Sequence, residues 1–288
     1  MKNKFKNLFL LFFSLYFCNC YGSWNPKCNG NDVGKRTRKL LQLTDEDTVF
    51  AEAGISRLNG KYDVLIFSDV HFGTRRTPSE LPESFFNWLD SVKGTEKEPA
   101  FAICLGDIAD VGKQSDYDEY LEFCTKLKND YGIKMIFNVC GNHDIYQNHW
   151  CNWKNNCYPY TSFYKFKTSG FSWYIFDTAS GFVGAQQYEL LKSDLEEDAN
   201  PKIMISHYPL TSFRPVGAGL NDSVERNTLI RDFSQSNVKC YFGGHNHQIQ
   251  EHYLGFNDYL CPSLRYGQGW MILHIDETAG TASAEVVE

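Results

Sequence analysis

The chain has 288 residues, of which 42% are hydrophobic and 22% are charged, as in ordinary globular proteins. One hydrophobic core can organise a chain of about this length, so we expect one main domain. The formal net charge is -7 at pH 7, and loss of an N-terminal leader with three lysines and no acidic residue would change it to -10. We do not expect such an acidic protein to bind nucleic acids generally, because that binding depends on lysine and arginine side chains.

The first 22 residues have the layout of a secretory signal peptide. Three lysines precede an apolar run over residues 8–17, and small or polar residues follow it. A membrane-spanning helix needs about 20 apolar residues, roughly twice the length of this run. We therefore predict that residues 1–22 direct export to a secreted, periplasmic or cell-surface location. In an alternative interpretation the leader is a lipoprotein signal, and a lipid on Cys20 is the protein's only link to a membrane.

Beyond the leader, we expect residues 23–60 to form an N-terminal extension and residues 61–288 to form the main domain. In chain order, the hydrophobic pattern predicts a strand over 64–67, a helix over 84–92, a strand over 101–105, a helix over 117–127, a strand over 135–139, a helix over 186–195, a strand over 203–205, a helix over 227–233 and a strand over 238–242. Strands that alternate with helices indicate an α/β core. Beyond residue 248 the pattern alternates and predicts antiparallel strands.

Cysteines are frequent, and eight of the ten lie beyond the leader. Export would place them where disulfides persist. We predict a disulfide between Cys151 and Cys157, which bracket a loop rich in tryptophan and asparagine. Cys104, Cys140 and Cys240 lie in apolar runs and could equally be buried free thiols.

Polar side chains that can bind metals follow five of the predicted strands. In chain order the motifs are DVH with Asp69 and His71, GDIAD with Asp107 and Asp110, GNHD with Asn142, His143 and Asp144, SH with His207, and GHNH with His245 and His247. Since ligands gather where strands end, we expect these side chains to lie at one edge of a sheet. Histidine and carboxylate suit divalent transition metals, and the set is too large for one four-coordinate ion. The pattern therefore predicts two ions that share one carboxylate.

These five motifs, in this order, resemble those of the calcineurin-like metallophosphoesterase family. The resemblance covers residues 69–247 and implies an α/β fold, a four-layer αββα sandwich of two mixed β-sheets flanked by helices. It also implies a metal-dependent enzyme that hydrolyses phosphate esters. In that family a hydroxide between two divalent metal ions attacks phosphorus in line with the leaving group. Mn, Fe and Zn all suit the ligands.

Carried over residue by residue, the resemblance implies two ligand sets that share Asp107. Asp69, His71, Asp107 and His247 would bind one ion, and Asp107, Asn142, His207 and His245 would bind the other. His143 would protonate the leaving group, Asp144 would orient His143, and Asp110 would hold a neighbouring loop or ligand. Acids at such positions also commonly cap turns and helices, so that alternative stays open for Asp110 and Asp144. Asp110 stands where purple acid phosphatases have tyrosine, which makes a ferric-tyrosinate centre unexpected.

The segments SDVHFG and SHYP look most like those of cyclic-nucleotide and secreted phosphodiesterases. We therefore expect an exported phosphodiesterase that acts on a small-molecule or lipid-headgroup phosphate ester. The predicted substrate walls are an aromatic loop over residues 150–160 and a loop over residues 211–220 with Arg214, while Arg75 and Arg76 could meet a second phosphate. The alternatives are a phosphomonoesterase or protein phosphatase, and a secreted binding protein on an inactive phosphoesterase scaffold.

Overall fold

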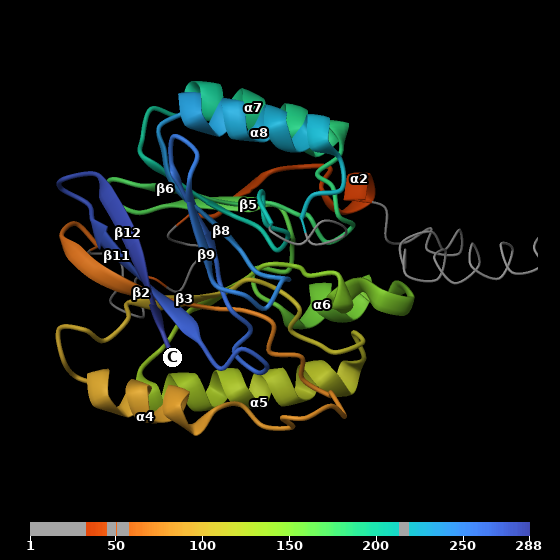
Figure 1. The fold of residues 1–288 in the computed structure, drawn as a ribbon, viewed down its shortest axis with the longest axis vertical. Coiled ribbons are helices and arrows are strands. Elements are labelled where there is room, and N and C mark those ends of the chain that lie inside the picture. Colours follow the sequence, from red (N-terminus) through yellow and green to blue (C-terminus); the bar gives the residue numbers. More distant parts are fainter. Residues whose placement is uncertain (1–32, 45–49, 51–57, 213–218) are drawn as a thin grey trace, which may run out of the picture.

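The computed structural model describes residues 33–44, 50, 58–212 and 219–288. Two β-sheets pack face to face, and helices cover their outer faces (Figure 1). The first sheet has the strand order β1 (Leu41–Gln42), β5 (Tyr164–Lys167), β6 (Ser172–Ile175), β7 (Lys202–Ile205), β8 (Val238–Gly243), β10 (Asn257–Leu260) and β9 (Gln250–Tyr253). The second has the order β12 (Thr281–Val287), β11 (Trp270–Asp276), β2 (Lys61–Phe67), β3 (Phe101–Cys104) and β4 (Ile136–Asn138). Both sheets are mixed, so the predicted αββα sandwich is confirmed.

Two helices cover each sheet (Figure 1). Helices α4 (Glu83–Val92) and α5 (Gln114–Tyr131) pack their apolar faces on the five-stranded sheet, and α7 (Ala185–Glu197) and α8 (Ser223–Gln235) pack theirs on the seven-stranded sheet. The predicted strands and helices up to residue 242 are thus confirmed within a few residues of their ends. Beyond residue 248, β9, β11 and β12 pair antiparallel as predicted, whereas β10 also pairs in parallel with β8. Shorter helices are α2 (Val33–Arg36), the 3-10 helix η2 (His143–Asn148) and α6 (Trp150–Asn156).

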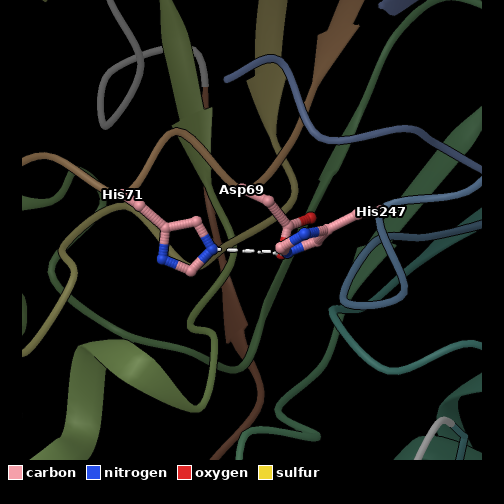
Figure 2. Close-up of side chains that lie close together, drawn as sticks. All are labelled: Asp69, His71 and His247. Atoms are coloured by element: carbon pink, nitrogen blue, oxygen red, sulfur yellow. Dashed lines mark hydrogen bonds and ion pairs between the residues drawn. The ribbon is translucent and has the colours of Figure 1, made fainter. Parts of the chain in front are cut away.

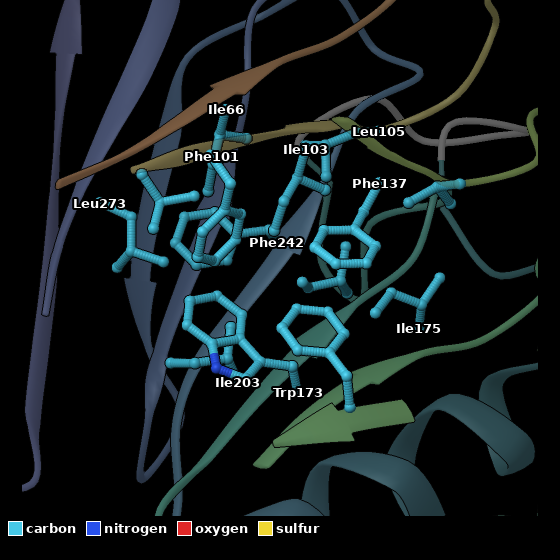
Figure 3. Packing of buried hydrophobic residues seen from close by; sticks show 14 of the residues in the cluster. Ile66, Phe101, Ile103, Leu105, Phe137, Trp173, Ile175, Ile203, Phe242 and Leu273 are labelled. Carbon is cyan, nitrogen blue, oxygen red and sulfur yellow. The ribbon is translucent and has the colours of Figure 1, made fainter. Parts of the chain in front are cut away.

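The central core lies between the two sheets, and Figure 3 shows part of it. Phe166 stacks on Phe137 with ring centroids 4.2 Å apart and on Trp173 with centroids 5.5 Å apart. Strands β2 and β3 contribute to this core with one face, and with the opposite face they bury Leu65, Cys104 and similar residues against the helices. Because both faces of these strands are covered, their sequences are continuous apolar runs. Burial of each large side chain stabilises the fold by about 1.5–3 kcal/mol.

The register of the parallel strands aligns the loops that follow them. Phe67 pairs with Cys104, which pairs in turn with Asn138, so β2, β3 and β4 end side by side. In the other sheet Ile205 pairs with Phe242, so β7 and β8 also end together. The five motif-bearing loops therefore leave the sandwich at one edge.

Part of the expected N-terminal extension packs on the domain. Strand β1 pairs in parallel with β5, and the buried Arg36 guanidinium donates hydrogen bonds of 2.7 and 2.9 Å to both carboxylate oxygens of Asp177. The predicted signal peptide, Cys20 and Arg214 lie outside the described residues. Within the described part of the chain, no helix is long and apolar enough to cross a membrane.

The predicted Cys151–Cys157 disulfide is wrong, because both residues are free thiols. The segment expected to be a loop forms helix α6, which carries the exposed Cys151 and ends beside the buried Cys157. Six residues of helix turn by roughly 600°, so these two side chains point in different directions. Trp153 is buried against α5 and anchors the helix. The buried Cys104, Cys140 and Cys240 are also free thiols.

Candidate metal centre

The loops after the strands hold several of the predicted ligands in a strained backbone conformation. Asp69, His71 and Asp107 have φ of 53°, 43° and 48°. The left-handed region costs residues with a β-carbon of order 1–3 kcal/mol each, and such conformations persist only where surrounding contacts enforce them. Gly141 allows two backbone segments to approach closely, since a β-carbon there would lie 2.2 Å from the backbone nitrogen of Asp107. The fold therefore stores strain at this edge to bring the side chains together.

A first group of possible ligands consists of Asp69, His71 and His247 (Figure 2). The Nε2 atom of His247 lies 3.2 Å from Asp69 Oδ1 and 3.4 Å from His71 Nε2. His71 Nε2 lies 3.8 Å from Asp69 Oδ1. Three potential ligand atoms thus converge on one point from the loops after β2 and β8.

A second group consists of Asp107, His207 and His245. His207 Nε2 lies 3.3 Å from Asp107 Oδ1 and 3.1 Å from the side-chain oxygen of Asn142. The other oxygen of Asp107, Oδ2, lies 3.9 Å from His71 Nε2 in the first group. Asp107 therefore stands between the two groups, and the structure brings together all seven residues that the sequence predicts as ligands.

The donor set fits metal ions better than it fits hydrogen bonding within the protein. Asp69 Oδ1 is buried, and His247 Nε2 at 3.2 Å, itself a potential metal ligand, is its nearest polar neighbour among the described residues. The Nδ1 atom of His207 lies 2.8 Å from the carbonyl of Leu105, which fixes the ring so that Nε2 faces Asp107. A carbonyl behind a histidine is a common way to orient a metal ligand. Two carboxylates and several imidazoles with converging lone pairs are therefore suited to two adjacent divalent cations.

The pKa values show how strongly these groups interact. Burial raises the pKa of Asp69, but His247 and His207 outweigh burial and lower this pKa to about 2. Burial also opposes ionisation of His207, yet Asp107 outweighs it and raises the pKa of His207 to about 9. Burial lowers the pKa of His71 to about 4, against the attraction of Asp107. At neutral pH the centre thus holds ionised carboxylates, a neutral His71 and a protonated His207.

Residues 62–249 match the sequence profile of the calcineurin-like phosphoesterases. The chain belongs to this family. It is therefore a metal-dependent phosphoesterase, of a family with a dinuclear metal site. A comparison with curated protein sequences found no significant match.

Solved structures with the same fold include a dimetal phosphatase from Danio rerio, with 11% sequence identity, a TM-score of 0.55, and coverage of 75% of this chain and 93% of that chain. A purple acid phosphatase from yellow lupin seeds has 11% identity and a TM-score of 0.55, and the match covers 80% of this chain and 54% of that one. GAP50, described as the anchor in the inner membrane complex of Plasmodium, has 15% identity and a TM-score of 0.53, with 80% and 85% covered. At these identities the likeness shows the fold alone.

In this phosphoesterase, His143 lies beside Asp107. Its backbone N–H donates to Asp107 Oδ1 at 2.8 Å, and its ring centroid is 4.7 Å from that of His71. Its Nδ1 lies 2.6 Å from the backbone carbonyl of Asp110. A carbonyl only accepts hydrogen bonds, so Nδ1 carries a proton and Nε2 is left to face a ligand.

The expectation that Asp144 orients His143 is wrong, because the carbonyl of Asp110 holds that ring. The buried Asp144 carboxylate instead accepts hydrogen bonds from the backbone N–H groups of Ile108 and Ala109, both at 3.0 Å, and of Gly141 at 2.8 Å. One carboxyl group thus satisfies three backbone donors, two of them in the loop after β3. Asp144 therefore ties two motif loops together. Burial, reinforced by the charge of Asp107, raises the pKa of Asp144 to about 7.

Three tyrosines flank the centre, and the sequence analysis did not identify them. Tyr208 stacks on His245 with centroids 3.9 Å apart, Tyr266 stacks on His247 at 5.5 Å, and Tyr146 lies 4.4 Å from His143. Their signal was weak: Tyr208 and Tyr146 lie within three residues of motif histidines, but nothing in the sequence links Tyr266 to the site. The side chain of Tyr146 is 38% exposed, so a ligand at the centre can contact it.

Tyr146 also orients a predicted ligand. The Nδ2 amide nitrogen of Asn142 donates to the Tyr146 hydroxyl at 3.3 Å, while Oδ1 faces His207 Nε2. An asparagine amide has one acceptor end and one donor end, so a partner for the donor end decides which way the amide points. The Tyr146 hydroxyl therefore directs the Asn142 oxygen toward the second group.

The predicted aromatic wall over residues 150–160 needs correction. Trp153 is buried in the core beside α5, and the half-buried Trp150 stacks on it with centroids 5.2 Å apart. The Arg36 guanidinium lies 5.6 Å from the ring centroid of Trp150. These two tryptophans thus hold helix α6 and the N-terminal extension in place. Arg75 and Arg76 are exposed, and the charge of Arg76 opposes the rise in the pKa of Tyr146 that burial causes.

Proposed function

We propose that the protein is an exported phosphodiesterase with two divalent metal ions at its centre. In this proposal Asp69, His71, Asp107 and His247 hold one ion, and Asp107, Asn142, His207 and His245 hold the other. When bound, such ions supply Lewis acidity toward phosphoryl oxygens and acidify a water molecule. Mn, Fe and Zn all suit the imidazole and carboxylate set.

The chain's own residues supply the proton for the leaving group. His143 Nδ1 donates to the Asp110 carbonyl, so a proton on Nε2 is the one available to an ester oxygen. The ring lies between His71 and Tyr146, which restricts its rotation. A positioned general acid of this kind contributes typically 10²–10⁴-fold to the rate.

The observation that supports a diester is the placement of tyrosine rings on both sides of the centre. Tyr146 flanks His143, where the leaving group would depart, and Tyr266 flanks His247 on the side of the first group. A diester carries an organic group on each side of phosphorus, so it benefits from apolar contacts at both places. A small-molecule or lipid-headgroup diester fits this arrangement.

The complete ligand set supports catalysis over an inactive binding scaffold. All seven predicted side chains are present and adjacent, whereas a scaffold that only binds has no need to keep buried acids and imidazoles together on a strained backbone. Export is supported by the lysines and apolar run of the leader. N-terminal sequencing of protein recovered outside the cell would locate the cleavage site, and an uncleaved protein inside the cell would contradict export.

A substrate panel tests the diester preference. The metal-free protein would be reconstituted with Mn, Fe or Zn and assayed on bis(p-nitrophenyl) phosphate, p-nitrophenyl phosphate, cyclic AMP, nucleotides and a phosphopeptide. Asp107→Ala is the matched control, because Asp107 belongs to both ligand sets and its loss should abolish metal retention and turnover. Brisk cleavage of monoesters or the phosphopeptide with every diester intact would assign the protein to the phosphomonoesterases or protein phosphatases instead.

A further inference from the structure

A short segment over residues 263–266 follows β10 and runs along the loop after β2. It lies outside the region that matches the family, 62–249. Its contacts follow the loop residue by residue. The backbone N–H of Leu264 donates to the carbonyl of Ser68 at 2.8 Å, the hydroxyl of Ser263 to the carbonyl of Asp69 at 2.8 Å, and Nε of Arg265 to the carbonyl of Val70 at 2.5 Å. We call residues 263–266 the clamp segment.

The clamp segment holds the loop where its backbone is most strained. Asp69 and His71 both have positive φ, and the three clamped carbonyls belong to residues 68–70. From the other side, the N–H groups of Asp69 and His71 donate to the carbonyls of Gly106 and Asp107, both at 3.0 Å. Bonds on both sides are what a strained conformation needs in order to persist.

Arg265 is buried although its hydrogen bonds go to neutral groups. Its guanidinium donates to the carbonyls of Val70 and Ser79 and lies 5.5 Å from the ring centroid of Phe72. Burial of a cation against neutral acceptors is costly, so it is seldom kept for stability alone. The carbonyl that Arg265 holds belongs to Val70, which lies between the predicted ligands Asp69 and His71.

Tyr266 supports the ligands directly. Its ring stacks on His247 with centroids 5.5 Å apart and 23° between the planes, and it lies 5.4 Å from the ring of His71. Its hydroxyl pairs with that of Thr74 at 2.9 Å, and its N–H donates to the Ser263 hydroxyl at 3.0 Å. The His247 side chain is 33% exposed, so Tyr266 is what restrains it on one face.

We propose that Ser263, Arg265 and Tyr266 are positioning residues for the first metal ion, the one bound by Asp69, His71 and His247. The inference rests on the proposed metal centre and adds that different parts of the chain position the ligands of its two ions. The clamp segment contacts the first group, whereas the second group is held by Leu105, Tyr146 and Tyr208. Loss of a side chain of the clamp segment should therefore weaken binding of the first ion and leave binding of the second ion unchanged.

Tyr266→Leu is the most informative change, because it removes the ring and the hydroxyl and leaves the buried Arg265 in place. Loss of a partner that supports a metal ligand typically lowers metal affinity about 10- to 100-fold. Tyr266→Phe keeps the stack on His247 and should recover most of the affinity. Ser263→Ala, which removes the hydroxyl that donates to the Asp69 carbonyl and accepts from the Tyr266 N–H, gives a second variant that keeps the Tyr266 ring. Tyr253→Leu, at a 77% exposed position on β9, is the control.

Each variant would be made in two backgrounds that isolate one ion. His245→Ala disables the second position and leaves the first to be titrated, and His71→Ala does the reverse. Mn²⁺ affinity is measured by calorimetric titration of chelator-treated, full-length protein, with circular dichroism to confirm folding. In the His245→Ala background, Tyr266→Leu and Ser263→Ala should weaken binding at least tenfold. In the His71→Ala background neither variant should change the Mn²⁺ affinity by more than about twofold. Tyr253→Leu should leave the affinity unchanged in both backgrounds.

The outcomes separate the two levels of the proposal. Equal effects of Tyr266→Leu in both backgrounds would mean that the clamp segment supports the fold in general, and the inference would be wrong. The absence of any effect in folded protein that still binds one ion would also refute it. If neither background binds an ion, the proposed metal centre itself fails.

Discussion

Metal binding by this protein should release protons, and the number released follows from the pKa values of the predicted ligands. His207 Nε2 lies 3.3 Å from Asp107 Oδ1, and that carboxylate raises the pKa of His207 to about 9. At pH 7 the ring is then about 99% protonated in the metal-free protein. A metal ion needs the neutral ring, so binding must displace this proton.

The protonation of the other ligands determines the total number of protons released. The pKa of Asp69 is lowered to about 2 and that of Asp107 falls well below its ordinary value, so neither holds a proton at pH 7. His71, whose pKa is about 4, is already neutral. The pKa of His247 is raised, because Asp69 outweighs the effect of burial, so this ring can only add to the release. We expect at least one proton per protein at pH 7.

The sign of the pH dependence follows from the raised pKa. Below about pH 9 the proton on His207 competes with the metal, so this ring alone should weaken binding about tenfold for each pH unit toward acid, or about 4 kcal/mol between pH 9 and pH 6. The same shift affects the metal-free fold. Protonated His207 stabilises it fully below its ordinary pKa of 6.5, and this stability, about 3 kcal/mol, is lost as pH rises to about 9.

The assay is calorimetric titration of chelator-treated protein with Mn²⁺ in buffers of different ionisation enthalpy at pH 7. The slope of the observed enthalpy against buffer enthalpy gives the number of protons released. His274→Gln is the control, since that histidine pairs with Asp63 on β2 and should not contribute. A slope near zero, or an affinity that stays constant from pH 6 to pH 9, would refute the reasoning.

Three further variants probe single contacts. His143→Ala should keep both ions and lose roughly two to four orders of magnitude in rate. The loss should be smaller for p-nitrophenyl esters, whose leaving group needs little protonation. Equal losses for p-nitrophenyl and alkyl esters would contradict the role of His143 as the acid. Tyr146→Phe removes the acceptor that orients the Asn142 amide, so the second ion should bind several-fold more weakly with the ring unchanged, and an unaltered metal titration would argue against this role. Arg36→Ala leaves Asp177 buried without its cation, so the free energy of unfolding in urea should fall by about 3–5 kcal/mol; an unchanged midpoint would show that this pair does not hold the extension.

Much of the site could be predicted because its signals are local. Each ligand follows directly after an apolar strand, and the chain order of Asp69, Asp107, Asn142, His207 and His245 identifies the family without any three-dimensional information. Parallel strands in register then force these loops to one edge of the sandwich. Periodicity likewise located the main helices, because each has one face buried against a sheet.

The tertiary structure decided what depends on contacts between distant segments. Whether Cys151 and Cys157 pair depends on the burial of Trp153, which makes their segment helical. The contacts of Asp144 depend on a loop more than thirty residues earlier, and its sequence position next to His143 was misleading. Tyr266 reaches the centre only because β10 adds to one sheet and the chain then crosses to the loop after β2. Such contacts are set by the packing of whole sheets, which a local pattern of residues does not encode.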